Sequence, residues 1–291
     1  WKEIKSEELK DIITAISGLY LEASSKDAMA IPGSTAQINI EVVNRSSSDI
    51  KLKSVVIGDL VSEDKDINLT DNDKQEFKVQ LNIPDDISYT SPYWLSKKGT
   101  LGMYTVEDPD LIGNPETPPA FHAVFNLEIE GYPIAIDKPV IHRYSKPDHG
   151  ELYHPFDILP VATASFQDKV MIFADGKSKK VPVSIKAHRD NIKGEIELCY
   201  STGWIVDKES KPFEIKNKGD EQIVFFELTP PESEDESFIS PIIKVDGKEL
   251  SKELVTIAYD HIPTQSVLLP SEAKVVRLNI QKVGEHIGYI V

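Results

Sequence analysis

The chain contains little cysteine, methionine or tryptophan, and it lacks any long apolar run. Its 291 residues include one cysteine, three methionines and three tryptophans. A single cysteine excludes an intrachain disulfide framework. No apolar run approaches the roughly 20 residues that a membrane-spanning helix needs. We also find no signal-peptide pattern and no glycine-rich phosphate-binding loop. The sequence therefore predicts neither membrane insertion nor nucleotide chemistry.

Positive charge is also scarce. The chain has 32 Lys and Arg residues against 48 Asp and Glu residues, which gives a formal net charge of −16. A surface of this sign repels the phosphates of nucleic acids and of anionic lipids, so we expect neither as a partner. The apolar fraction of 40% is enough to build a packed core without disulfides or metals.

What the sequence has in quantity is the pattern of short antiparallel strands. Glu195 to Cys199 alternates polar and apolar residues and leads to the pair Gly203-Trp204. A second alternating run, 222–229, ends at Pro230-Pro231. Short alternating runs separated by polar turns are typical of β-sandwiches. We therefore predict a mainly β protein made of tandem immunoglobulin-like β-sandwiches with one N-terminal α-helix.

The domain organisation follows from changes in this pattern. Residues 3–23 carry apolar side chains every three to four positions, which predicts a helix. A proline-containing run at 144–151 interrupts the strands and suggests a boundary. We expect three parts, which are a helix with its linker (residues 1–27), a first sandwich (28–143) and a second sandwich (144–291).

Residues 84–119 form a long segment rich in proline and aromatic residues. Tyr89, Tyr93, Trp94 and Tyr104 all lie in it. Long irregular segments in compact domains are usually functional or packed against a neighbour. Aromatic faces cover the apolar C–H patches of sugar rings, so Tyr93, Trp94 and Tyr104 would form a platform for a glycan. The alternative is that they act as a plug that packs the loop onto a sandwich or the other domain.

One cluster has residue types that ligate zinc. His149, Glu151, His154 and Asp157 fall within nine residues. The odd spacing of the two histidines would put them on opposite faces of a strand, and nothing in the segment is helical. We keep an autonomous metal-dependent hydrolase as an alternative, but favour polar residues of a linker.

Two further residues have conventional structural explanations. Cys199 sits in an alternating segment, so we expect a buried small hydrophobe rather than a nucleophile. Trp204 ends a strand, which favours a place in the core between two sheets. No Gly-x-Ser-x-Gly nucleophile elbow is present.

A family resemblance rests on short motifs that occur in order along the chain. They are Leu19-Tyr20, Asn44–Ser46, Ser91–Leu95, Leu111–Pro115, Gly150-Glu151, Leu159-Pro160, Gly203-Trp204, Tyr259–Pro263 and Ile287–Ile290. In this respect the chain resembles the region that follows the catalytic domain in PIG-L (LmbE-like) deacetylases. Its second half resembles the NEW3-type β-sandwich found beside carbohydrate-active enzymes.

The resemblance implies a function as well as a fold. PIG-L enzymes use zinc to remove acetyl groups from N-acetylglucosamine-type sugars, through a His-Pro-Asp-Asp motif. Here His154-Pro-Phe-Asp157 only mimics that motif, because Phe156 replaces a required carboxylate. No catalytic residue and no cofactor is therefore assigned to this chain, and zinc is expected only in a catalytic domain outside it.

The expected function is that of a non-catalytic accessory region that scaffolds or orients the catalytic domain of the same polypeptide. The alternative is a carbohydrate-binding module that uses the loop aromatics. The resemblance further implies a bacterial parent protein that is periplasmic, secreted or exposed on the cell surface.

Overall fold

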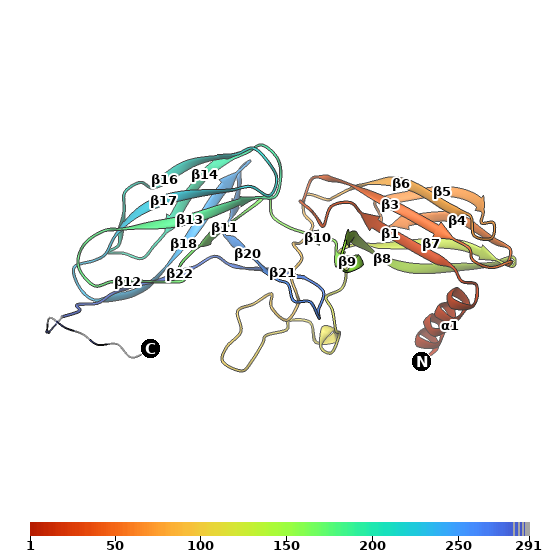
Figure 1. The fold of residues 1–291 in the computed structure, drawn as a ribbon, viewed down its shortest axis with the longest axis horizontal. Coiled ribbons are helices and arrows are strands. Elements are labelled where there is room, and N and C mark those ends of the chain that lie inside the picture. Colours follow the sequence, from red (N-terminus) through yellow and green to blue (C-terminus); the bar gives the residue numbers. More distant parts are fainter. Residues whose placement is uncertain (282, 285, 287, 289–291) are drawn as a thin grey trace. The chain divides into compact units, whose positions relative to one another are not determined.

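A computed structural model describes residues 1–281, 283, 284, 286 and 288. Most of the Ile287–Ile290 motif therefore lies outside the described residues. The chain divides into two compact units, each a mainly antiparallel β-sandwich of immunoglobulin-like type (Figure 1). Unit 1 comprises Trp1–Leu159 and the returning segment Thr256–Val267. Unit 2 comprises Pro160–Val255 and the residues from Leu268 onward. The predicted fold class is confirmed.

Unit 1 contains a helix and ten of the strands. The helix is α1 (Lys2–Ile16), and a short 3-10 helix, η1 (Pro109–Leu111), lies in the long loop. The strands are β1 (Tyr20–Ser25), β2 (Met29–Ala30), β3 (Thr35–Val43), β4 (Ile50–Ile57), β5 (Val61–Asn68), β6 (Lys74–Asn82), β7 (His122–Ile129), β8 (Tyr132–Lys146), β9 (Gly150–Pro155) and β10 (Asp157–Ile158).

The long strand β8 belongs to both layers of unit 1. Its first half completes the order β5-β4-β7-β8, and its second half joins β9, β1, β3 and β6. The change occurs at Pro139, which is paired with β7, whereas Val140 is already paired with β1. Proline has no N–H to donate, so it fits a position where the hydrogen-bond ladder changes partner.

The core of unit 1 follows from the alternation in its strands. On β3, Ile38, Ile40 and Val42 are fully buried, whereas their neighbours Gln37 and Glu41 point to the other face. Successive side chains of a strand point to opposite faces, so an alternating sequence buries one set. Phe125 on β7 and Leu52 on β4 face this set from the other layer.

Unit 2 is a sandwich of a four-stranded sheet, with the order β11-β13-β17-β15, and a six-stranded sheet, with the order β12-β22-β18-β14-β16 and β19 paired to β18. Its strands are β11 (Ala162–Phe166), β12 (Val170–Phe173), β13 (Lys179–Ala187), β14 (Ile192–Cys199), β15 (Ile205–Val206), β16 (Ser210–Ile215), β17 (Glu221–Thr229), β18 (Asp235–Val245), β19 (Lys248–Leu250) and β22 (Ala273–Arg277). Strands β20 (Lys252–Ile257) and β21 (Gln265–Pro270) pair as a two-stranded sheet around the returning segment.

The core position predicted for Trp204 is confirmed. Its side chain is 2% exposed and its ring meets the ring of Phe173 edge to face, with centroids 5.0 Å apart. The indole Nε1–H donates to Asp235 Oδ2 at 2.7 Å. A buried tryptophan usually finds such a partner for its one donor.

The prediction for Cys199 is wrong, because this side chain is exposed. On β14 the alternation places Ile196 and Leu198 in the core, so Cys199 is out of phase with them. It lies opposite Ser240 on β18, on the outer face of the sheet. The composition of the segment was apolar enough to suggest burial, but the period of two decides the face.

The helix is shorter than the predicted 3–23. It ends at Ile16, because Gly18 adopts a positive φ of 55° and Tyr20 already begins β1. A left-handed residue just after a helix is a common stop signal, and glycine adopts it without strain. Residues 20–25 are thus a central strand of unit 1 rather than part of a linker.

The two units meet in sequence at Leu159–Pro160, rather than at the expected position between residues 143 and 144. Residues 144–151 do not form a linker. Pro147 lies in the tight turn of the β8–β9 hairpin, where His149 N–H donates to Lys146 O, and Gly150 begins β9 opposite Lys146. Turn residues have the same composition in a hairpin and in a linker, so the sequence pattern predicted the wrong domain boundary.

Helix α1 exposes its apolar side chains. Trp1, Ile4, Leu9, Ile12 and Ile16 are all exposed, and no residue of α1 is buried. Among the described residues, no helix is long and apolar enough to cross a lipid bilayer.

Candidate functional site

The aromatic residues of the long loop do not stack into one flat platform. Tyr93 and Trp94 meet edge to face, with centroids 4.9 Å apart and ring planes at 86°. Tyr93 is held in place, because its hydroxyl donates to Asn114 O at 2.9 Å and its N–H donates to Thr117 Oγ1. Tyr104 is 66% exposed, and no ring contact between described residues joins it to this pair. A glycan-binding role for Tyr93, Trp94 and Tyr104 stays a prediction.

The four candidate metal ligands are not brought together. His149 pairs with its neighbour Asp148, and Glu151 pairs with Arg143. The Nδ1 atom of His154 makes a hydrogen bond with Pro155 O. Within the described ranges, no group of three or more His, Cys, Asp or Glu side chains is placed to hold a metal ion.

The fourth candidate, Asp157, is a buried carboxyl in a small cavity of unit 1. Thr90 Oγ1 donates to Asp157 Oδ1 at 3.0 Å and accepts from Ile158 N–H at 3.0 Å. Burial raises the pKa of Asp157, against the opposing effects of a hydrogen bond from Ser266 and of nearby His154. This carboxyl joins β10, the long loop and the returning segment, so its role is structural.

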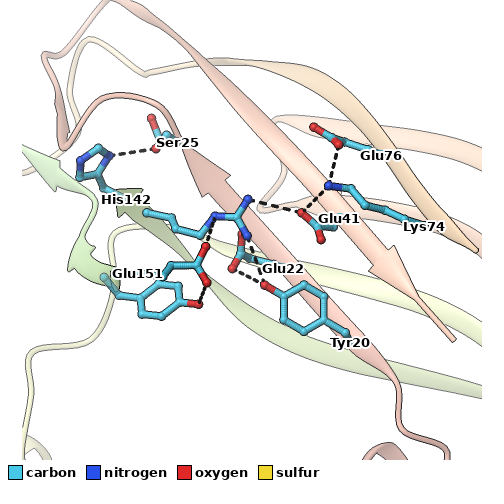
Figure 2. A network of polar contacts seen from close by, with 10 residues as sticks. Tyr20, Glu22, Ser25, Glu41, Lys74, Glu76, His142 and Glu151 are labelled. Atoms are coloured by element: carbon cyan, nitrogen blue, oxygen red, sulfur yellow. Dashed lines mark hydrogen bonds and ion pairs between the residues drawn. The ribbon is translucent and has the colours of Figure 1, made fainter. Parts of the chain in front are cut away.

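Glu151 instead belongs to a polar network on the outer face of unit 1 (Figure 2). Arg143 on β8 is at its centre, with guanidinium nitrogens 3.0 Å from Glu22 Oε1, 3.4 Å from Glu41 Oε2 and 3.3 Å from Glu151 Oε1. The hydroxyl of Tyr153 donates to Glu151 Oε2 at 3.1 Å. The arginine thus connects three strands and holds the hairpin strand β9 to the sheet.

The register explains why this arginine is needed. Glu22 on β1 lies directly opposite Glu41 on β3, which in turn lies opposite Glu76 on β6. Like charges directly opposite each other destabilise a sheet. Arg143 compensates the first pair, and Lys74 reaches Glu41 at 3.1 Å and Glu76 at 2.8 Å. Glu22 is only 6% exposed, so its charge depends on these partners.

Tyrosines complete the network. Tyr20 donates to Glu22 Oε2 at 2.7 Å, and its pKa is strongly raised by burial and by this hydrogen bond. The pKa of Tyr153 is raised by burial and by its hydrogen bond to Glu151. Both hydroxyls therefore stay protonated and act as hydrogen-bond donors at neutral pH.

A cavity with aromatic and polar walls adjoins this network. It is lined by the β8–β9 hairpin and the returning segment, both in unit 1, and Glu151 and Tyr153 belong to both the network and the cavity. Tyr153 is 47% exposed and Tyr259 is 63% exposed. We call this the hairpin cavity. Its lining residues are Tyr144, Lys146, His149, Glu151, Leu152, Tyr153 and residues 258–264.

The hairpin cavity reaches both faces of the hairpin. Arg143 and Tyr153 are a cross-strand pair, and Tyr144 and Leu152 are the next pair, so their side chains point to opposite faces. Two of the aromatic walls are stiffened by stacking. Tyr144 stacks on His142 with centroids 5.4 Å apart, and Tyr259 stacks on His261 with centroids 5.8 Å apart.

The charged groups in the wall of the hairpin cavity are of both signs. The lining includes the ammonium of Lys146 and the carboxylates of Glu151 and Asp260, and the imidazoles of His149 and His261 add further hydrogen-bonding nitrogens. Such a wall offers both donors and acceptors but no concentrated positive charge for an anion. Together with exposed tyrosine rings, it suits a neutral ligand with many hydroxyl groups.

A second cavity in unit 1 has mostly apolar walls. We call it the proline cavity. Its lining residues are residues 114–119, Pro139, Val140, Ile141, Tyr153, His154, Pro155 and Pro263. Tyr153 and Pro263 line both the hairpin cavity and the proline cavity.

Sequence reasoning singled out two residues of the hairpin cavity, His149 and Glu151, but for a different chemistry. It missed Arg143, Tyr153 and Tyr259. The available signal was the run Tyr259–Pro263, which contains a tyrosine and a histidine but was noted only as a motif of the resemblance. That this run returns to the hairpin follows from tertiary contacts alone.

Comparison with known proteins leaves the family open. No protein-family model and no curated protein matches the chain. A crystal structure of a mutant of Salmonella alpha-2-macroglobulin is 10% identical, with a TM-score of 0.30, over 89% of this chain and 16% of that chain. Native E. coli alpha-2-macroglobulin gives 10% identity and a TM-score of 0.30, over 89% of this chain and 17% of that one.

A protein of unknown function from Porphyromonas gingivalis is 11% identical, with a TM-score of 0.22, over 89% of this chain and 99% of its own. This chain thus spans about a sixth of the alpha-2-macroglobulin chains. All these scores are below 0.5, so the likenesses carry no argument about what the chain does.

Proposed function

We propose that the chain is a non-catalytic accessory β-sandwich region of a carbohydrate-active protein, and that it binds a saccharide in the hairpin cavity. The observation that carries this proposal is the wall of that cavity, which combines exposed Tyr153 and Tyr259 with carboxylates, imidazoles and a lysine. This site replaces the long-loop aromatics as the preferred glycan contact.

The chemistry of a sugar ring matches these groups. One face of a pyranose is a patch of C–H bonds that packs on an aromatic ring, and its rim carries hydroxyls that hydrogen-bond with polar side chains. Glu151 is oriented by Arg143 and Tyr153, so one acceptor is fixed before a ligand arrives. A preorganised wall reduces the entropy lost on binding.

The test is a saccharide panel measured by calorimetry on the whole chain. Tyr259→Ala removes an exposed ring of the cavity and should weaken binding about tenfold, since aromatic contacts contribute roughly 0.5–1.5 kcal/mol beyond the buried area. The matched control is Tyr132→Ala, because Tyr132 is also exposed but does not line the cavity. Absence of binding across the panel would refute the proposal.

A second function is favoured by the exposed apolar face of α1. We propose that this face docks on the catalytic domain of the same polypeptide, which the resemblance expects to be a deacetylase. Leu9, Ile12 and Ile16 would be the contacts, because exposed apolar side chains grouped on one face mark interaction sites.

The docking proposal has its own test. The double variant Ile12→Glu with Ile16→Glu should abolish binding to a separately expressed upstream domain in calorimetry. Neither residue is buried, so the fold should survive. Lys10→Glu is the matched control on the opposite side of the helix. If the double variant binds as well as the control, the docking proposal is wrong.

A further inference from the structure

The hairpin cavity and the proline cavity are neighbours with contrasting walls. The first is lined by charged and hydroxyl-bearing side chains, and the second is lined mainly by proline, valine and isoleucine. Because Tyr153 and Pro263 line both, a ligand in one cavity lies beside the other. The two cavities therefore share part of their walls, although one is mainly polar and the other mainly apolar.

Tyr153 is suited to the boundary between the two cavities. Its hydroxyl donates to Glu151 Oε2 at 3.1 Å, which directs its polar end into the charge network. Its ring lines both cavities and remains about half exposed. Tyrosine commonly occupies such boundaries, because one end of its side chain is apolar and the other is polar.

The proline cavity is unusual for this protein. The chain carries a net charge of −16, yet apart from Glu116 the lining of the proline cavity has no carboxylate or ammonium group. Open apolar walls on a highly charged surface mark a binding site more often than a packing defect. Prolines also keep such a wall rigid, because their φ angle is fixed.

We infer that the two cavities bind one amphiphilic ligand, a saccharide that carries an acyl or alkyl chain. The sugar ring occupies the hairpin cavity and the chain occupies the proline cavity. This inference rests on the proposed saccharide function of the hairpin cavity and adds the class of substituent. The ligand binds non-covalently, and no group is transferred.

The experiment compares two probes that share a sugar, methyl β-glucoside and octyl β-glucoside, both below the micelle-forming concentration. Affinity for the whole chain is measured by calorimetry. Each methylene buried in the proline cavity should tighten binding about fourfold, so we expect octyl glucoside to bind at least about ten times more tightly.

Two matched variants test whether the alkyl chain of the ligand lies in the proline cavity. Pro118→Glu places a carboxylate in the wall of the proline cavity and should remove the advantage of octyl glucoside. Pro109→Glu changes a proline of the same long loop outside both cavities and should leave the advantage intact. Thermal unfolding of both variants checks that neither has lost the fold.

The outcomes separate this inference from the proposed function. Equal affinity for the two glucosides, in a chain that binds sugars on the panel, would overturn the inference and leave the proposed function standing. If octanol bound as tightly as octyl glucoside and Tyr259→Ala had no effect, both the inference and the proposed function would be overturned. The alkyl chain of the ligand alone would then account for binding. Binding of neither glucoside would overturn the inference, and the saccharide panel would judge the proposed function separately.

Discussion

Unit 1 and unit 2 are both β-sandwiches, and an arginine-centred charge network in unit 1 contrasts with a buried histidine in unit 2. Unit 1 keeps charges on a sheet face, where Glu22 and Glu41 are held by Arg143. Unit 2 buries His188, whose Nε2 makes a hydrogen bond of 3.0 Å with Thr163 Oγ1. Burial lowers the pKa of His188 to about 4, so this residue is neutral at pH 7.

This difference teaches where to look for function in a duplicated architecture. Compensated charges cost desolvation energy and offer little net stability in return, so a cavity beside such a network is a good place to look for a function. In unit 1 the charge network adjoins the hairpin cavity and orients Glu151 in its wall. In unit 2 the buried histidine has no such cavity beside it among those described above.

The largest expected effect concerns the core of unit 2. Trp204→Ala removes a buried ring that packs on Phe173 and donates to Asp235, so we expect a loss of about 3–5 kcal/mol in the free energy of unfolding. Urea unfolding followed by hydrogen exchange in each unit would check it. The comparison predicts faster exchange in unit 2. Equal acceleration in unit 1 would show that the two sandwiches do not respond separately.

The next effect is a pH dependence in unit 2. The pKa of His188 is depressed from 6.5 to about 4, so the unfolded chain takes up the proton first as the pH falls. The contribution of His188 to the free energy of unfolding is therefore fully present above about pH 6.5. It is lost as the pH falls from about 6.5 to about 4, by about 3 kcal/mol in all. Urea unfolding at several pH values should show this slope, and His188→Gln should flatten it. An unchanged slope in the variant would contradict the assignment.

A smaller effect is expected in unit 1 from Arg143→Met. The variant removes the ion-pair partner of Glu22, which lies opposite Glu41, whereas Glu41 keeps its contact with Lys74. We expect a loss of about 2 kcal/mol, below the 3–5 kcal/mol of a fully buried pair, because Arg143 is partly exposed. The control is Arg189→Met, which breaks an exposed pair with Asp246 and should cost about 0.5 kcal/mol or less. Similar losses in both variants would remove the distinction between the units.

The smallest effect has the opposite pH dependence and sharpens the comparison. Burial raises the pKa of Asp157 in the folded protein. The favourable contribution of the protonated carboxyl to stability is therefore fully present below about pH 3.9 and is lost as the pH rises through the folded pKa. Asp157→Asn should therefore stabilise unit 1 slightly at pH 7 and have no benefit at low pH, as measured by thermal unfolding. Asp59→Asn is the control, because Asp59 is exposed in unit 1, and it should change the stability neither at pH 7 nor at low pH.

The sequence correctly predicted the features that depend on the local alternation of apolar and polar residues. The alternating runs 195–199 and 222–229 predicted strands, and the position of Trp204 predicted a place in the core; both predictions are confirmed. Cys199 shows the limit of this approach, because apolar composition without the correct phase places a residue on the wrong face. The candidate site was largely missed, since its walls come from residues 144–153 and 258–264, which are about a hundred positions apart.

By itself, the sequence determined the β-sandwich architecture, the one α-helix found among the described residues and the absence of an intrachain disulfide, because these depend on periodicity and on one cysteine. Only the tertiary structure decided that β8 continues to Lys146, that Glu22 lies opposite Glu41 and that the returning segment meets the β8–β9 hairpin. The physical reason is that a period of two fixes which face a side chain occupies but not which strand lies beside it. Strand pairing, and with it the placing of Arg143 and the hairpin cavity, is settled by packing across the whole of unit 1.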